Sequence, residues 1–158
     1  MKAYKIEAVV HICQMAELSE EDKELVEAAK QATNSSYAPY SKFRVGAAAR
    51  LQNSVVVVGA NQENAAFPSG LCAERTALFA AGAQHPDQPV VALAIAARKG
   101  SRFLDKPITP CGNCRQVISG MEDRHGIPIR ILLYGTEGIY VSEGISPLLP
   151  LRFVGDDM

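Results

Sequence analysis

The chain has 158 residues, of which 47% are hydrophobic, and 16 Lys and Arg residues against 17 Asp and Glu give a formal net charge of −1. This length is sufficient to bury a core without disulfide staples. No cluster of Lys and Arg stands out along the sequence, which argues against nucleic acid as a partner, because binding to a polyanion needs a basic stripe or patch. A small neutral substrate suits this charge better.

The N-terminal segment MKAYKIEAVVHICQMAELSEED lacks the long apolar core of a signal peptide. No apolar run is long enough to span a bilayer, so we expect no membrane association. Both observations favour a cytoplasmic protein. In that compartment a thiol serves more often as a metal ligand or catalytic group than as half of a disulfide.

The first elements are a strand and a helix. Residues 3–12 partly alternate between apolar and polar side chains, which predicts a strand at an edge of a sheet. A helix is expected over 18–37, with a capping-box-like start formed by Ser19 and Asp22. Its apolar face would be formed by Leu25, Val26 and Ala29.

A hairpin follows the turn-rich segment 37–41. The two strands are expected over 43–51 and 54–62, joined at QNS. The continuous valines of the second strand predict burial on both of its faces.

Strands and helices alternate in the remainder of the chain. The expected elements are a helix over 69–82, a strand over 90–98, a helix over 110–126 with Pro110 in its first turn, strands over 128–135 and 138–142, and a short helical turn over 145–150. This order predicts an α/β fold of three layers, α/β/α, with a central mixed sheet. Ligands commonly bind in such folds where a strand ends and a helix begins.

Three of the four cysteines stand in patterned surroundings. Cys111 and Cys114 are three residues apart at an expected helix start, so their side chains share a face, and Cys72 stands at another helix start. Amide N–H groups and the helix dipole stabilise thiolates at such positions. Three thiolates from two helix starts can hold one Zn²⁺ and leave the fourth position open, as catalytic zinc requires. Cys13 is expected to be a buried strand residue without a role.

Two other interpretations of these cysteines stay open on the pattern alone. Cys111 and Cys114 could form a redox pair, which would not need Cys72. A closed structural zinc site would need a fourth ligand, and the three histidines are not placed at metal-ligand spacing.

Glu74 and Arg75 follow the first of these cysteines. A carboxylate beside an open zinc position can take a proton from water and return it to a leaving group. For an isolated residue, a first-turn Glu favoured by the helix dipole is the simpler explanation. The Arg75 guanidinium could offset the negative charge of the thiolates, and its simpler explanation is a surface arginine.

At these residues the sequence resembles a known family. CAERTA together with PCGNCRQV is similar to the zinc motif of the small, homotetrameric cytidine deaminases that act on free nucleosides. YAPYSKFRVGAA resembles the segment before their first hairpin, NQENAAFPSGLCAERTAL resembles their nucleoside-binding stretch, and SPLLPLRF resembles their C-terminal end. The resemblance covers roughly residues 20–155 in order.

The resemblance implies a role for each matching residue. The Zn²⁺ ligands would be Cys72, Cys111 and Cys114. Glu74 would be the proton shuttle, and Arg75 would support the thiolates. The substrate-binding residues would be Tyr40, Phe43, Asn61, Glu63, Ala73 and Phe153.

Two of the substrate-binding residues also follow from the strand pattern. Asn61 and Glu63 come after the valine strand and lie two residues apart, so both face one side at its end. By the resemblance they would hydrogen-bond the ribose. Phe43 would pack on the ring, the backbone at Ala73 would read the base edge, and Tyr40 would line the pocket.

The resemblance implies a hydrolase of pyrimidine salvage, which converts cytidine and deoxycytidine to uridine and deoxyuridine plus ammonia. One alternative is a deaminase of another aminopyrimidine nucleoside, such as a nucleoside antibiotic. Another is a catalytically inactive binding module stabilised by zinc. A nucleic-acid-editing deaminase should show a basic groove and stacking aromatics, and the chain has no Trp.

The resemblance also implies a homotetramer with shared active sites, in which Phe153 would reach the site of a neighbouring subunit. We expect a single domain over 1–158, with 1–18 as an N-terminal extension to which no role is assigned. Phe67 stands where the family usually has Tyr, which removes one hydroxyl at the intersubunit edge. The end RFVGDDM resembles the family's tail only loosely.

Overall fold

The computed structural model describes residues 1–158. Its seven strands form one mixed sheet in the order β1-β7-β6-β4-β2-β3, with β5 paired to β4. The strands are β1 (His11–Cys13), β2 (Phe43–Leu51), β3 (Val56–Ala60), β4 (Val90–Lys99), β5 (Arg102–Phe103), β6 (Arg130–Gly135) and β7 (Gly138–Glu143). The helices are α1 (Glu20–Ala32), α2 (Ala73–Gln84) and α3 (Gly112–His125). No helix combines the length and the apolar character needed to cross a bilayer.

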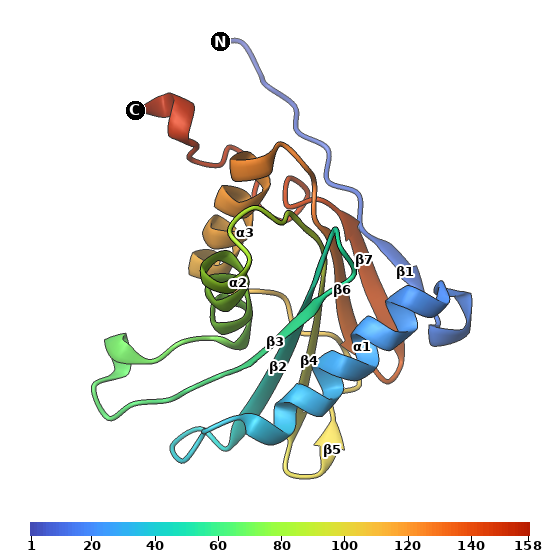
Figure 1. The fold of residues 1–158 in the computed structure, drawn as a ribbon. Coiled ribbons are helices and arrows are strands. Elements are labelled where there is room, and N and C mark those ends of the chain that lie inside the picture. The colour runs from blue at the N-terminus through green and yellow to red at the C-terminus, as the bar shows by residue number, and fades with distance from the viewer.

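Helices cover both faces of the sheet. In Figure 1, α1 crosses one face while α2 and α3 lie together on the other. Neighbouring residues of β2 point to opposite faces of the sheet. Ala47 and Ala49 pack in the cluster with α2 and α3, whereas Ala48 packs under α1. Only β4 and β6 pair in parallel. The expected three-layer α/β/α fold with a mixed sheet is confirmed.

Two glycines allow the helices to approach the sheet closely. A Cβ atom on Gly46 would lie 2.2 Å from the carbonyl oxygen of Ala29 in α1. A Cβ atom on Gly59 would lie 2.4 Å from the backbone nitrogen of Ala77 in α2. Real Cβ atoms do not tolerate such distances, so backbone contact between β3 and α2 sets where α2 begins.

Helix α1 begins as the sequence predicts and ends earlier. The Ser19 hydroxyl accepts a hydrogen bond from the Asp22 amide at 3.2 Å, and the expected apolar face is buried. The α-helix stops at Ala32 and tightens into a 3₁₀ turn over Thr33–Ser35. The Thr33 hydroxyl donates to the Lys30 carbonyl at 2.7 Å, a local bond that competes with helix continuation.

Both edge strands differ from the sequence prediction. The first strand covers His11–Cys13 rather than 3–12, because only these three residues pair with β7. Cys13 lies in this strand but is half-buried rather than buried. In β3 only one face is covered, since Val57 is buried while Val56 and Val58 are 43% and 53% exposed. The expectation that both faces are buried was wrong because β3 is an edge strand, and only the Ala60 end of its second face is buried.

The later elements agree with the sequence in type. The strand expected over 90–98 is β4, and those expected over 128–135 and 138–142 are β6 and β7. Residues 145–150 contain a single turn, in which the amides of Leu148 and Leu149 donate to the Ile145 carbonyl. The short strand β5 had no sequence signal.

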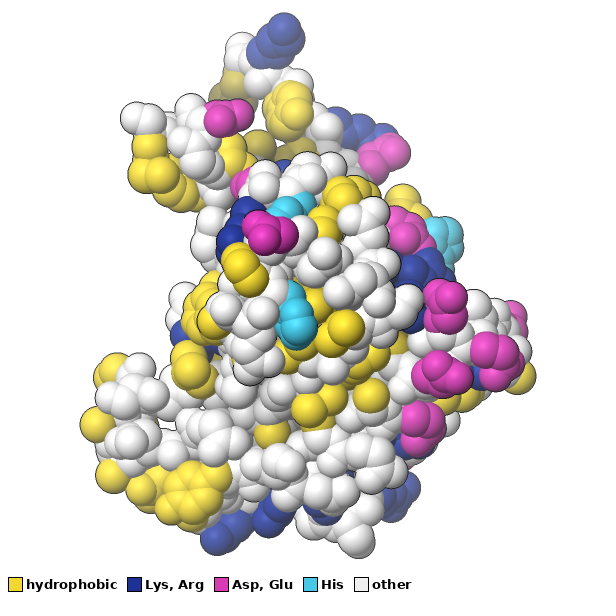
Figure 2. All heavy atoms as spheres, in the orientation of Figure 1, with side chains coloured by type: hydrophobic (Ala, Val, Ile, Leu, Met, Phe, Trp, Pro, Cys, Tyr) yellow, Lys and Arg dark blue, Asp and Glu magenta, His cyan; other side chains and the backbone are white.

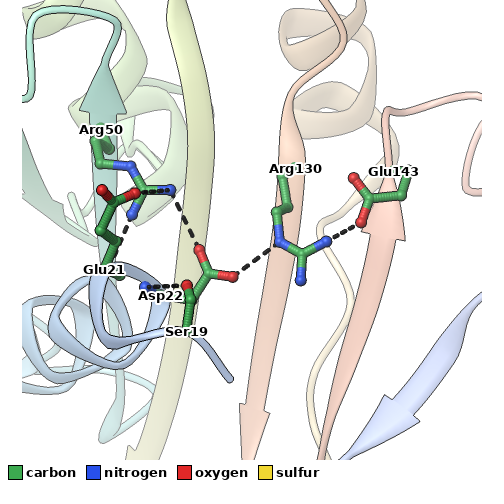
Figure 3. Close-up of polar contacts among 6 residues, drawn as sticks. All are labelled: Ser19, Glu21, Asp22, Arg50, Arg130 and Glu143. Atoms are coloured by element: carbon green, nitrogen blue, oxygen red, sulfur yellow. Dashed lines mark hydrogen bonds and ion pairs between the residues drawn. The ribbon is translucent and has the colours of Figure 1, made fainter. Parts of the chain in front are cut away.

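A buried carboxylate connects α1 to three strands. Asp22 is 3% exposed and accepts hydrogen bonds from Arg50 of β2 at 3.2 Å and from Arg130 of β6 at 2.9 Å. Figure 3 shows its carboxylate between the two guanidinium groups, with Arg130 also paired to Glu143 of β7. The Arg50 side chain further donates to the backbone carbonyl of Glu21 at 2.8 Å. This network fixes α1 across the sheet, on the face opposite α2 and α3.

Replacement of the buried carboxylate should therefore destabilise the fold. In Asp22→Asn two arginines lose their shared counter-charge, and we expect the free energy of unfolding to fall by about 3 kcal/mol, the lower end for a broken buried pair because Arg130 is partly exposed. Urea unfolding followed by circular dichroism measures this. Asp87→Asn, at an exposed position, is the matched control. Equal stability of the two variants would contradict a structural role for the network.

Candidate metal and active site

Three cysteines meet where two helices begin. Cys72 is the residue before α2, Cys111 is the residue before α3, and Cys114 lies in the first turn of α3. The sulfur of Cys111 lies 3.8 Å from that of Cys72 and 3.4 Å from that of Cys114, and all three lie within 4.8 Å of one another. Cys13 is on β1, at the opposite edge of the sheet from β3.

The start of α3 differs slightly from the sequence prediction. Pro110 was expected in the first turn of the helix, but Cys111 is the capping residue and Pro110 precedes it. The first cysteine of the CxxC pair therefore stands at the N-cap itself, where neither cysteine cap makes a side-chain hydrogen bond to the helix backbone. Both capping sulfurs are directed to the shared cluster.

The thiols share negative charge unequally. The Cys114 thiol, acting as hydrogen-bond donor, together with Arg75 and Cys111, lowers the pKa of Cys72 to about 5. The same hydrogen bond, together with burial, raises the pKa of Cys114. Cys72 is therefore a thiolate at neutral pH, and a soft divalent cation would displace the remaining protons.

Arg75 lies against the sulfur cluster. Its Nη2 atom is 3.8 Å from the sulfur of Cys72, and this contact raises the pKa of the guanidinium. Its Nε atom is buried and has no hydrogen-bond partner. The side chain offsets the thiolate charge, so the simpler explanation of a surface arginine does not apply.

Glu74 lies in the first turn of α2, beside the thiols. Only 4% of the residue is exposed. Burial raises the pKa of its carboxyl group, and the negative charge of Cys72 acts in the same direction. A carboxyl group with a raised pKa beside a metal site is suited both to accept and to donate a proton.

The cluster forms one end of a cavity of about 860 Å³. Five of the six residues expected to bind substrate line it, namely Tyr40, Phe43, Asn61, Glu63 and Ala73. Further lining residues that the sequence analysis did not identify are Ser41, Val45, Gln62, Asn64, Gly70, Leu71, Ile108 and Thr109. The cavity lies where β3 ends and α2 begins, the kind of junction the fold class predicted.

The sixth residue, Phe153, does not line the cavity of its own chain. It is 55% exposed on the C-terminal segment. Its backbone carbonyl accepts a hydrogen bond from Gln116 of α3 at 2.8 Å, which holds this segment along the helix.

The Asn61 amide is engaged with the protein itself. Its oxygen accepts hydrogen bonds from the Ser36 hydroxyl at 2.5 Å and the Val45 amide at 2.8 Å. Its nitrogen donates to the Phe43 carbonyl at 2.9 Å. Asn61 therefore fixes the start of β2, and with it the aromatic ring of Phe43, against the end of β3.

Glu63 organises the part of the cavity formed by Tyr40 and Ser41. Its carboxylate accepts hydrogen bonds from the Tyr40 amide at 2.9 Å and the Ser41 amide at 3.2 Å, and also from the Ser41 hydroxyl. The Ser41 side chain is the main reason that the pKa of Glu63 is lowered. The carboxylate thus stays ionised and keeps this part of the cavity negative.

Two aromatic rings form part of the cavity rim. Tyr40 and Phe67 meet edge to face, with ring centroids 5.8 Å apart. Phe67 is 74% exposed and lies in the 3₁₀ turn Phe67–Ser69 that leads toward α2. The segment between β3 and α2 therefore supplies both polar and apolar walls.

Comparison with known proteins identifies the family. The family model for the cytidine and deoxycytidylate deaminase zinc-binding region matches residues 19–127. A cytidine deaminase of Halalkalibacterium halodurans is 39% identical over 134 residues, which cover 85% of this chain and 95% of that protein. A cytidine deaminase of Mycobacterium tuberculosis is 40% identical over 135 residues, with 82% and 87% covered.

Solved structures agree with this result. The crystal structure of cytidine deaminase from Burkholderia pseudomallei superposes with a TM-score of 0.71 at 37% identity, covering 86% of this chain and all of that one. That from Mycobacterium tuberculosis gives a TM-score of 0.67 at 32% identity, with 86% and 99% covered. The chain belongs to the cytidine and deoxycytidylate deaminase family with its zinc-binding region. Zn²⁺ is its cofactor, and the three convergent thiols have the donor chemistry that the ion requires.

The unequal charge of the thiols can be tested in metal-free protein. Because the pKa of Cys72 is lowered to about 5, its thiolate fraction rises through that pH and is complete by pH 7. We expect alkylation of Cys72 by iodoacetamide, mapped by peptide mass spectrometry, to follow that curve and to stop when zinc is added. Cys13 is the internal control, since burial raises its pKa and its reaction should begin only at alkaline pH. Coincident pH profiles for the two cysteines would contradict the assignment.

Proposed function

We propose that this protein catalyses the hydrolytic deamination of cytidine and deoxycytidine to uridine and deoxyuridine, with release of ammonia. The observation that carries the proposal is the buried Glu74 beside three convergent thiols, in a cavity that is also lined by the ionised carboxylate of Glu63. The relatives named cytidine deaminase support the same reaction. They give no support to another aminopyrimidine substrate or to an inactive binding module.

The three cysteines would hold Zn²⁺, which supplies Lewis-acid activation of a water molecule. Glu74 accepts the proton of that water and delivers it to N3 of the cytosine ring, which makes C4 more electrophilic. The hydroxide left from that water adds to C4, and Glu74 then takes the proton of the new C4 hydroxyl group and passes it to the 4-amino group, so that the C4–N bond breaks, ammonia leaves and a C4 carbonyl forms. The raised pKa of Glu74 suits both transfers. Arg75 keeps the sulfur cluster from accumulating excess negative charge.

The remaining cavity residues would orient the nucleoside. The backbone at Ala73 faces the base edge, Phe43 packs on the ring, and Tyr40 closes the rim. Asn61 and Glu63 would take the ribose, with the Ser41 hydroxyl as the group that a ribose hydroxyl replaces on Glu63. An ionised carboxylate in this part of the cavity disfavours a phosphate, so nucleosides should be preferred to nucleotides.

We further propose a cytoplasmic homotetramer in which Phe153 enters the site of a neighbouring subunit. An exposed aromatic ring on a segment outside its own cavity supports this arrangement. A single domain over 1–158 is also proposed, with no function assigned to 1–18.

The direct test is turnover followed by the loss of cytosine absorbance. Purified protein should consume cytidine and deoxycytidine and leave cytidine monophosphate largely unchanged. A zinc-loaded protein inert on both nucleosides would overturn the proposed substrate. Rapid turnover of the monophosphate alone would reassign the substrate to the nucleotide.

The proton shuttle makes a separate prediction. Glu74→Gln keeps the size of the side chain but removes its acid–base function, so we expect kcat to fall on the order of 10²–10⁴-fold while zinc content is retained. Steady-state kinetics and metal analysis measure the two quantities. Glu24→Gln, an exposed change on α1, should leave both unaltered. A Glu74→Gln enzyme with near-normal kcat would remove Glu74 from the mechanism.

Glu63 should affect substrate binding rather than the chemical step. In Glu63→Gln the side chain is neutral and holds both the Tyr40–Ser41 backbone and a ribose hydroxyl less strongly. We expect KM for cytidine to rise about tenfold, as for one weakened charge-assisted hydrogen bond, with a smaller effect on kcat. An unchanged KM would argue against a ribose contact. Glu24→Gln again serves as the control.

A further inference from the structure

A second cavity lies beside the same chain segment, 36–44, that borders the zinc cavity. It has a volume of about 390 Å³. Its lining consists of Ser36, Tyr37, Ala38, Pro39, Lys42, Arg44 and Gly100. No residue is shared with the zinc cavity, although both cavities border the segment 36–44.

Side chains of this segment alternate between the two cavities. Ser41 and Phe43 line the zinc cavity, whereas Lys42 and Arg44 line the second one. Lys42 has a φ of 57°, a left-handed backbone conformation that is uncommon for a residue with a side chain. This turn leads directly into β2, where the alternation of strand side chains continues it.

Positive charges lie in the second cavity, on Lys42 and Arg44, and beside it, on Arg98. Arg44 of β2 pairs directly with Arg98 of β4 in the sheet register. Like charges directly opposite each other in a sheet are destabilising unless something neutralises them. We call Lys42, Arg44 and Arg98 the basic cluster.

No carboxylate forms an ion pair with any member of the basic cluster. The three donor nitrogens of Arg98 bond to neutral acceptors on Thr33, Asn34 and Gly100. Arg44 has only two long bonds, of 3.5 and 3.4 Å, from one of its nitrogens to backbone carbonyls. Its other guanidinium N–H groups have no protein partner.

The surface view agrees with this charge distribution. Figure 2 shows Lys and Arg atoms along the lower edge, below the loop that enters β2 and the β4–β5 hairpin. By contrast Arg50, Arg130 and Arg152 each contact carboxylates elsewhere in the molecule. Arg44 differs from these arginines because most of its guanidinium N–H groups have no protein acceptor and it lines a cavity.

We propose that the basic cluster binds a small phosphate-bearing anion in the second cavity. The free N–H groups of Arg44 form a planar donor set that matches the oxygens of a phosphate. Lys42 adds a point charge on a long side chain. Arg98 does not line the cavity, but it lies opposite Arg44 in the sheet and donates a hydrogen bond to the carbonyl of Gly100, a lining residue. The cavity is too small and the charge too local for a nucleic acid strand, which needs an extended basic groove.

An anion bound in the second cavity should affect the residues that line the zinc cavity. The Tyr37 amide donates to the Asn61 carbonyl at 3.0 Å, and the Glu63 amide donates to the Tyr37 carbonyl at 2.8 Å. Glu63 in turn holds the amides of Tyr40 and Ser41. The segment 36–44 is therefore bonded to both proposed ribose residues, and an anion that orders it should lower KM for the nucleoside. This kinetic consequence rests on the proposed function, whereas the binding itself does not.

Isothermal titration calorimetry of the full chain at low ionic strength tests the binding without any nucleoside. The probes are inorganic phosphate, pyrophosphate and a nucleoside triphosphate, with sodium chloride at matched ionic strength as the blank. We expect saturable binding of at least one probe at one site per chain. Pyrophosphate alone would be sufficient if a free anion is the ligand, and a requirement for the triphosphate would identify a nucleotide. No saturable binding of any probe overturns the proposal.

Charge-matched variants distinguish binding in the second cavity from non-specific electrostatic attraction. Arg44→Gln and Lys42→Gln should each weaken binding at least tenfold, while Arg102→Gln and Lys106→Gln, at exposed positions outside the cavity, should not. Melting temperatures verify that each variant is folded. Equal losses in all four variants would show non-specific attraction and overturn the site. Anion binding without a change in KM would support the site but contradict its effect on nucleoside binding. Turnover measured without anion tests the proposed function separately.

Discussion

The convergence of two helix starts on one sulfur cluster is the constraint on which the rest of the site depends. Cys72 and Cys111 occupy the capping positions of α2 and α3, and the first turn of each helix adds a further functional side chain. Amide N–H groups and helix dipoles stabilise negative charge at that place. Because Glu74 follows Cys72 on the same turn, the contact that positions the proposed metal ligand Cys72 also positions the proposed proton carrier Glu74.

The sheet holds the helices where this convergence is possible. Gly59 lets the backbone of α2 rest directly on β3, and the small residues of β2 and β4 allow helices close approach on both faces. On the opposite face Asp22 ties α1 to β2 and β6. The polar end of the cavity depends on a second local arrangement, in which Asn61 and Glu63 hold the segment that enters β2.

Signals within a short stretch of sequence predicted most elements in type but not their exact bounds, and burial that depends on strand order was not predicted. The cap at Ser19, the helix starts at the cysteines and the alternation of strands with helices are local, and each predicted its element. The valines of β3 suggested burial on both faces, yet their exposure is decided by an edge position that only the assembled sheet defines. The hydrogen bonds of the Asn61 amide and the pairing of Arg44 with Arg98 were not predicted for a similar reason. In each case the two partners are distant in sequence and meet only in the folded sheet.

The central claim is a zinc site with three sulfur ligands and one open position beside Glu74. X-ray absorption spectroscopy at the zinc edge of the purified protein tests it most directly. We expect three sulfur neighbours at about 2.3 Å and one oxygen or nitrogen neighbour at about 2.0–2.2 Å. Four sulfur neighbours, or a zinc ion without sulfur neighbours, would contradict it, because neither leaves a position for water next to the Glu74 carboxyl group.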